Sequence, residues 1–149
     1  MGAASRDNGG EVAMDDRLQF TLSSFGFKYG PPLTASHLWD VRFLPNPYWV
    51  EEMRDLTGLD PRVAAYVLDN PAGRRFLHLA RPFLAFLVEQ NLAAGRPEMW
   101  LAIGCTGGQH RSVAVVEALG QGLLDLPVDL VVRHRDCPGT AAAEPAPGW

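Results

Sequence analysis

The sequence predicts an α/β fold, a layered sandwich with a mostly parallel sheet. The apolar run Met99–Ile103 is short enough for a buried strand, and it is followed by a glycine-containing loop. The next apolar residues, within Val113–Leu119, have the spacing of the buried face of a helix. Strands that alternate with helices in this way are typical of a parallel sheet covered by helices. A chain of 149 residues is long enough for one such domain.

The first part of the chain predicts two strands. Arg17–Ser24 alternates apolar and polar residues, which indicates a strand with one buried face. A loop over residues 25–32 and a single helical turn over Leu33–His37 are expected next. Leu38–Leu44 is the second predicted strand, and it ends at Pro45-Asn46-Pro47 because each proline requires an extended residue before it.

The middle of the chain predicts two helices. Residues 48–56 are irregular or helical, and Asp60-Pro61 is a helix start with an N-cap aspartate. The first helix covers residues 61–69, and Pro71 begins a second helix that continues to about Leu92. Its apolar residues recur from Phe76 onward with helical periodicity, Pro82 is a candidate kink and Gly95 a candidate C-cap.

The last predicted strand is Val128–Asp136, after a helix that ends near residues 120–122. In parallel α/β sheets, ligands bind at the carboxyl edge of the strands. This rule places residues 105–112 and the basic segment Arg133-His134-Arg135 around one crevice, with Lys28 and Arg42 as further candidates. Arg42 is two residues from Asp40, so the pair would share a strand face, as a surface pair or as an oriented anion ligand.

The segment Cys105–Ser112, CTGGQHRS, is the predicted binding loop. A loop between a strand and a helix start directs free backbone N–H groups toward one point, where the helix dipole is positive. Gly107 and Gly108 allow close approach of the backbone, and Arg111 supplies a planar donor for phosphate or carboxylate. The loop therefore predicts an anion site that also includes Thr106, His110 and Ser112.

Composition narrows the class of protein. The net charge of −4 disfavours a strongly cationic nucleic-acid binder, and the chain has no apolar run of membrane-spanning length. Residues 1–16 lack a signal-peptide core, so a cytoplasmic protein without a membrane association is expected. Its two cysteines predict no disulfide framework. The expected organisation is a disordered segment 1–16, one domain over 17–136 and a flexible tail 137–149.

The same loop also matches a catalytic pattern, Cys105 followed by five residues, then Arg111 and Ser112. It resembles the phosphate loop of cysteine-dependent phosphatases, in which a thiolate at a helix N-terminus is the nucleophile. Here Cys105 would attack, Arg111 would hold the phosphate and Ser112 would assist the leaving group, with Asp40 or Asp136 as general acid. No metal site is predicted, because the nearby arginines would repel a cation, and no cofactor is predicted.

Five blocks of sequence occur together and in one order over residues 17–136: SFGFKYG, DVRFLPNP, LTGLD, GCTGGQHRSV and RHR. In this combination the chain resembles the C-terminal domain of the RapZ (YvcJ) family. Members of that family also carry an N-terminal P-loop nucleotide-binding domain. The present sequence does not contain that domain, so the resemblance implies no ATPase or GTPase activity for it.

The resemblance implies a phosphofructokinase-like subdomain that senses glucosamine-6-phosphate, acts as a homo-oligomer and, in some members, presents small RNAs to an endoribonuclease. It implies that Thr106, Gly107, His110 and Arg111 hold the sugar phosphate. Lys28, Arg42, Asn46 and the Arg133–Arg135 segment would lie nearby. RNA-binding members have a basic cluster after the last strand, whereas residues 137–141 here contain no basic residue. A phosphorylated small molecule and a protein partner are therefore expected before RNA.

Two hypotheses follow from the residues and the resemblance together. The favoured one is a non-catalytic domain that binds a phosphorylated sugar or nucleotide-sugar. The alternative is a small cysteine-dependent phosphatase. Arg111 is central to both hypotheses.

Overall fold

The computed structural model describes residues 16–140, and it has the predicted α/β architecture. The expectations for residues 1–15 and 141–149 lie outside the described part of the chain. Four strands form one sheet in the order β3-β4-β2-β5, and all three strand pairings are parallel. The strands are β2 (Leu18–Gly26), β3 (His37–Asp40), β4 (Glu98–Cys105) and β5 (Val128–His134).

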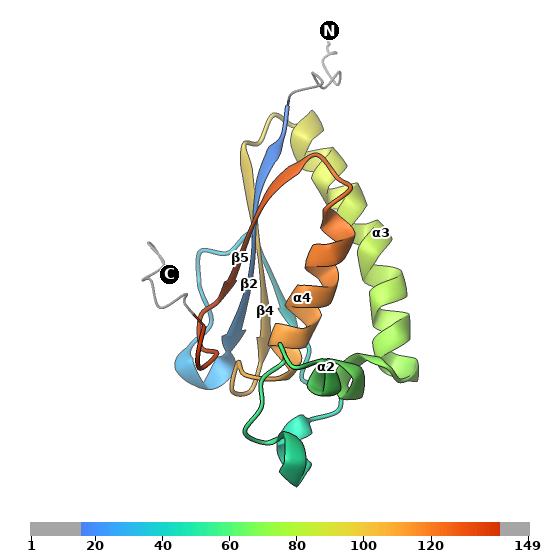
Figure 1. Cartoon of the computed structure of the whole chain (residues 1–149). Coiled ribbons are helices and arrows are strands. Elements are labelled where there is room, and N and C mark those ends of the chain that lie inside the picture. The colour runs from blue at the N-terminus through green and yellow to red at the C-terminus, as the bar shows by residue number, and fades with distance from the viewer. Residues whose placement is uncertain (1–15, 141–149) are drawn as a thin grey trace, which may run out of the picture.

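Three α-helices lie on one side of the sheet: α2 (Pro61–Leu68), α3 (Pro71–Ala93) and α4 (Arg111–Leu123) (Figure 1). The predicted helix starts are confirmed, because the Asp60 carboxylate accepts a hydrogen bond from the Arg62 amide. Asn70 caps α3 in the same way through the Gly73 amide. Helix α4 lies against β2, β4 and β5, and α3 packs on the side of α4.

The core lies between the sheet and the helices. Alternate residues of the two central strands are buried there: Leu18, Phe20 and Leu22 of β2, and Met99, Leu101 and Ile103 of β4. They pack against the apolar face of α4 and against Leu84 and Val88 of α3. Truncating such a fully buried leucine costs about 2–5 kcal/mol, so this layer sets the position of α4 and of the loop before it.

The segment around β3 differs from the prediction. The helical turn predicted over Leu33–His37 is wrong, since residues 33–36 form turns and a bend and His37 begins a strand. The strand predicted to reach Leu44 ends at Asp40. The Asp40 carboxylate accepts a hydrogen bond from the Arg42 amide at 2.9 Å, and this local bond turns the chain away from the sheet. The segment predicted to be irregular or helical over residues 48–56 contains part of one short 3-10 helix, η2 (Pro47–Trp49), and all of a second, η3 (Glu51–Met53).

The strand register brings all four carboxyl ends to one edge of the sheet. Gly26 of β2 pairs with Cys105 of β4, and Asp40 of β3 pairs with Gly104. On the other side of β2, Ser24 pairs with His134 of β5. The loop between β4 and α4 therefore begins beside the end of β2, where a ligand site is expected in a parallel sheet.

Candidate functional site

A pocket of about 490 Å³ opens at this edge of the sheet. Its floor is the loop between β4 and α4, and its walls come from the segment after β2, from η2 and from the segment after β5. It contains six residues predicted for the anion site: Lys28, Asn46, Thr106, Gly107, His110 and Arg111. The remaining lining residues are Tyr29, Tyr48, Trp49, Cys105, Gln109, Asp136 and Pro138.

The loop holds its shape through close backbone packing on the end of β2. The Lys28 amide donates to the Thr106 carbonyl at 3.2 Å, and Gly108 has a φ of +74°, which favours glycine. A Cβ added at Gly26 would lie 2.5 Å from the carbonyl carbon of Gly107. Gly108 is therefore a structural residue of the turn, and Gly26 leaves the space that the loop occupies.

Arg111 is the first residue of α4, and its side chain is only 6% exposed. Its Nη1 donates to the carbonyl of Arg42 at 2.7 Å and to the carbonyl of Leu44 at 3.3 Å. Its Nη2 lies 3.4 Å from the Thr106 hydroxyl. These neutral partners fix the guanidinium at the pocket without neutralising its charge.

The Nε of Arg111 is buried and makes no hydrogen bond within residues 16–140. A buried cation is stable only when a counter-charge or several strong acceptors compensate its desolvation. The positive end of the α4 dipole adds to the same potential at the loop. The electrostatics of this end of the pocket therefore favour an anionic ligand.

His110 connects the loop to the segment that follows η3. Its Nε2 lies 3.1 Å from the Arg54 carbonyl, and the Gln109 amide donates to the Leu56 carbonyl at 2.8 Å. Burial lowers the pKa of His110 below its ordinary value of 6.5, with hydrogen bonds to backbone acting in the other direction. Burial therefore favours the neutral imidazole, which contacts the Arg54 carbonyl and also contributes to the pocket lining.

Cys105 and Ser112 lie at the base of the loop. The Cys105 thiol is 3.2 Å from the Ser112 hydroxyl, and Cys105 is 2% exposed while Ser112 is fully buried. Cys105 contributes to the pocket lining, whereas Ser112 does not. A phosphatase nucleophile must reach the phosphorus atom of its substrate, and this packing leaves Cys105 little accessible surface for that attack.

The basic segment Arg133-His134-Arg135 at the end of β5 does not line the pocket. Arg135 donates to the Gly30 carbonyl at 2.7 Å and to the Asp136 carboxylate at 2.8 Å. His134 is buried between the Ser24 hydroxyl, 2.8 Å from its Nδ1, and the Glu117 carboxylate, 2.7 Å from its Nε2. Both side chains therefore join elements of the fold.

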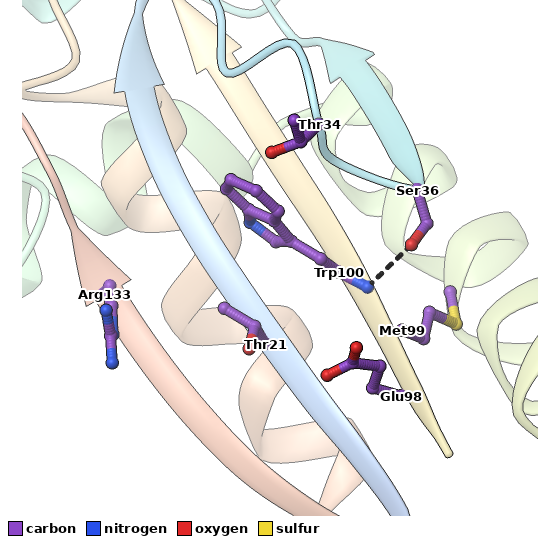
Figure 2. A pocket seen from close by; sticks show the side chains of 7 residues that line it. All are labelled: Thr21, Thr34, Ser36, Glu98, Met99, Trp100 and Arg133. Carbon is purple, nitrogen blue, oxygen red and sulfur yellow. Dashed lines mark hydrogen bonds between the residues drawn. The ribbon is translucent and has the colours of Figure 1, made fainter. Parts of the chain in front are cut away.

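Arg133 lines a different pocket, of about 380 Å³, on the face of the sheet opposite the helices. Figure 2 shows it with Thr21 and Trp100, whose side chains project from β2 and β4 on that face. Arg42 is also absent from the lining of the loop pocket. It forms a two-point ion pair with Asp40, which lowers the pKa of that carboxyl, and its guanidinium lies 4.0 Å from the centre of the Phe27 ring.

The pocket has an aromatic rim of Tyr29, Tyr48 and Trp49, and neither Tyr48 nor Trp49 was predicted from the sequence. Asn46 caps η2 by accepting a hydrogen bond from the Tyr48 amide, so Asn46-Pro47 directs the two following rings. Arg54 holds this rim, because its Nε donates to the Tyr48 carbonyl and its guanidinium lies over the Tyr48 ring. The Asn46-Pro47 cap was the sequence feature from which the position of these two rings could have been predicted.

Asp136 was predicted only as a candidate general acid. In the structure its carboxylate accepts a hydrogen bond from the Gly26 amide.

Neither a metal site nor a membrane-spanning helix occurs among the described residues. Residues 16–140 contain no group of three or more His, Cys, Asp and Glu side chains placed to hold a metal ion. None of the helices in this part of the chain has the length and apolar character needed to cross a membrane.

Comparison with known proteins adds an independent observation. A sequence model for the family described as the RapZ C-terminal domain matches residues 18–138. Nucleotide-binding proteins from Mycobacterium leprae and Mycobacterium tuberculosis are each 52% identical over 118 residues, 78% of this chain and 39% of the relative. A nucleotide-binding protein from Frankia alni is 49% identical over 121 residues, 81% of this chain and 42% of the relative. The chain thus spans about two fifths of the length of these relatives.

Proposed function

Because the chain belongs to the RapZ C-terminal domain family, we propose that it is a regulatory domain that binds a phosphorylated sugar or a nucleotide-sugar. Glucosamine-6-phosphate is the ligand type that we propose to test first. The site is the pocket over the Cys105–Arg111 loop.

The observation that carries this proposal is the buried guanidinium of Arg111 at the pocket. Its partners are two carbonyls and a hydroxyl, and its Nε has no partner within residues 16–140. A phosphate that accepts hydrogen bonds from this group and from the loop amides would provide the missing negative charge. Thr106 and Gly107 are the proposed contacts on the loop, and Lys28 provides a second cation in the pocket lining.

The rest of the pocket suits the uncharged part of such a ligand. The side-chain NH2 group of Asn46 offers donors for sugar hydroxyls, and the side-chain carbonyl of Gln109 offers an acceptor. The aromatic rim offers flat apolar faces. Sugar rings and nucleobases both pack on aromatic faces, so this rim is compatible with either ligand class.

We propose that the bound ligand controls an interaction with a protein partner in the cytoplasm, through a homo-oligomer. An RNase adapter role with small RNA is the less favoured extension. A protein of net charge −4 offers little general attraction for a polyanion, and the described residues after β5 are Cys137-Pro138-Gly139-Thr140 with no cation among them.

Isothermal titration calorimetry tests the proposal directly. The full chain would be titrated with glucosamine-6-phosphate, with UDP-glucose and with inorganic phosphate. We expect saturable binding of at least one organic ligand and competition by phosphate. In a thermal melt, ligand at 100 times its dissociation constant would add about 2.7 kcal/mol to the free energy of unfolding.

Two variants make this result specific to the site. Arg111→Lys keeps a positive charge but loses the planar donor, so it should weaken binding by about 10-fold or more. Arg96→Ala changes an exposed arginine that does not line the pocket, and it should bind normally. Saturable binding that Arg111→Lys leaves unchanged would refute this site. Hydrolysis of an aryl phosphate that is lost in Cys105→Ser would instead support the phosphatase.

A further inference from the structure

Helix α3 exposes an unusual apolar surface on the side away from the sheet. Leu79, Phe83 and Phe86 are exposed by 57%, 48% and 51%, and Pro82 is exposed between them. We call these four residues the α3 crest. Figure 1 shows α3 at the outer side of the helical layer, and no other helix of residues 16–140 covers it there.

The apolar surface continues on both sides of the α3 crest. On the side of β3, the rings of Trp39 and Phe83 stack at 6.2 Å, and a hollow of about 320 Å³ lies between them and Leu79. On the other side, Pro82 and Phe86 border a groove of about 550 Å³ that reaches Leu126. Contiguous apolar surface with exposed aromatic rings is typical of protein interfaces.

The sequence of α3 gives this surface a regular seam. Arg75, Leu79, Pro82, Phe86 and Glu89 follow one another at spacings of four, three, four and three residues. A 4-3 repeat keeps side chains on one face of a helix, as in helices that pack against each other along their length. The centre of the seam is apolar, and its ends carry opposite charges.

The charges define the orientation of a partner. Pro82 stands seven residues after Arg75 and seven before Glu89. Two copies of α3 packed antiparallel, with a two-fold axis at Pro82, would place Arg75 of each copy beside Glu89 of the other. The same axis would bring Leu79 close to Phe86 of the other copy. A parallel arrangement would instead oppose like charges, so only the antiparallel one is complementary.

We propose that the α3 crest is the interface of a homodimer in which two α3 helices pack antiparallel about a two-fold axis at Pro82. A surface that is complementary to itself is the requirement for such an isologous interface. This interface is separate from the loop pocket, since none of its seam residues lines that pocket. Both pockets of the dimer would therefore remain open to ligand.

Sedimentation velocity of the full chain over a range of concentrations tests the dimer. We expect a concentration-dependent dimer, and Phe86→Glu should raise its dissociation constant by about 100-fold or more, since it places a carboxylate in the apolar part of the seam of both copies. Leu33→Glu is the matched control, because Leu33 is exposed on the segment before β3 and lies outside the seam. It should leave the dimer unchanged.

A charge exchange tests the orientation. Arg75→Glu and Glu89→Arg should each weaken the dimer by about 3-fold to 10-fold, and the double variant should restore it. Circular dichroism would verify that each variant is folded. A wild-type chain that stays monomeric at every concentration would overturn the proposal and assign the crest to a different partner. A dimer that survives Phe86→Glu would overturn it in favour of another surface, and failure of the double variant to restore association would refute the antiparallel arrangement.

Discussion

Arg111 and Arg135 both lie near the carboxyl edge of the sheet, and both were predicted to bind the same anion. The guanidinium of Arg135 donates to the Asp136 carboxylate and to the Gly30 carbonyl, and it lies 5.7 Å from the centre of the Phe25 ring. Arg111 instead meets two carbonyls and one hydroxyl. Arg135 is held in an ion pair with Asp136, whereas Arg111 makes no ion pair within residues 16–140.

This contrast shows that the partners of an arginine decide its role more than its distance from a pocket does. If Arg135 bound a ligand, it would have to give up its charge-assisted hydrogen bond to Asp136 in exchange for one to the ligand. Arg111 has no carboxylate partner to give up. The segments that carry Arg111 and Arg135 should therefore respond differently to mutation.

Gly26 contacts both the loop before Arg111 and the segment around Arg135, so its substitution should affect both of these segments. In Gly26→Ala the added Cβ would meet the carbonyl carbon of Gly107 at 2.5 Å, while the Gly26 amide holds Asp136. We expect a loss of about 2–3 kcal/mol in the free energy of unfolding and no measurable ligand binding. Urea denaturation and calorimetry would measure the two effects.

Gly107→Ala is the control for that change, because a Cβ at Gly107 meets no atom within 4 Å and the residue has no positive φ. It should alter the free energy of unfolding by less than about 0.5 kcal/mol. Equal destabilisation by both alanines would contradict the close packing of the loop on β2.

The arginine comparison itself is tested by a matched pair of substitutions. Arg111→Met should reduce ligand affinity by about 100-fold, because it removes the uncompensated charge at the pocket. Arg135→Met should change ligand affinity by less than about 3-fold and destabilise the protein by about 1 kcal/mol. Both quantities are available from titration of the two variants and from their thermal melts. If Arg135→Met proved the more damaging for binding, the assignment of Arg111 would be wrong.

His110 predicts a dependence of stability on pH. Burial lowers its pKa in the folded protein, so the unfolded chain takes up a proton more readily. The contribution of neutral His110 is complete above pH 6.5 and is lost as the pH falls from there toward the lowered pKa of the folded state. The slope is at most about 1.36 kcal/mol per pH unit for one proton.

His110→Gln should flatten this dependence in urea denaturation between pH 7 and pH 5. His78→Gln, at an exposed position of α3, should retain it. An unchanged slope in His110→Gln would mean that other groups are responsible.

Cys105→Ser should have the smallest effect on ligand binding. The thiol is almost fully buried and bonds to Ser112, so a hydroxyl of similar size keeps the contact. We expect an affinity within about 2-fold of the wild type and a modest loss of stability from burying a more polar atom. A large loss of affinity would indicate direct contact between the sulfur and the ligand, and would bring the phosphatase hypothesis forward.

The local patterns of the sequence determined the elements of the fold and the loop. Alternation in residues 17–24, the Asp60-Pro61 start and the apolar spacing of α4 each act within one segment, so each could be interpreted without knowledge of the fold. The glycines and Arg111 also belong to one short segment, and its placement at the carboxyl edge followed from the parallel sheet.

Tertiary structure decided what the remaining polar groups do. Only the folded chain brings Asp136 to Gly26 and His134 to Glu117. Asp136 and His134 were both predicted near the anion, and these hydrogen bonds engage them within the fold instead. It also ends β3 at Asp40 and gathers Tyr29, Tyr48 and Trp49 into a rim. Hydrogen bonds and ring contacts between distant segments depend on where the backbone goes, and no local pattern in the sequence encodes that.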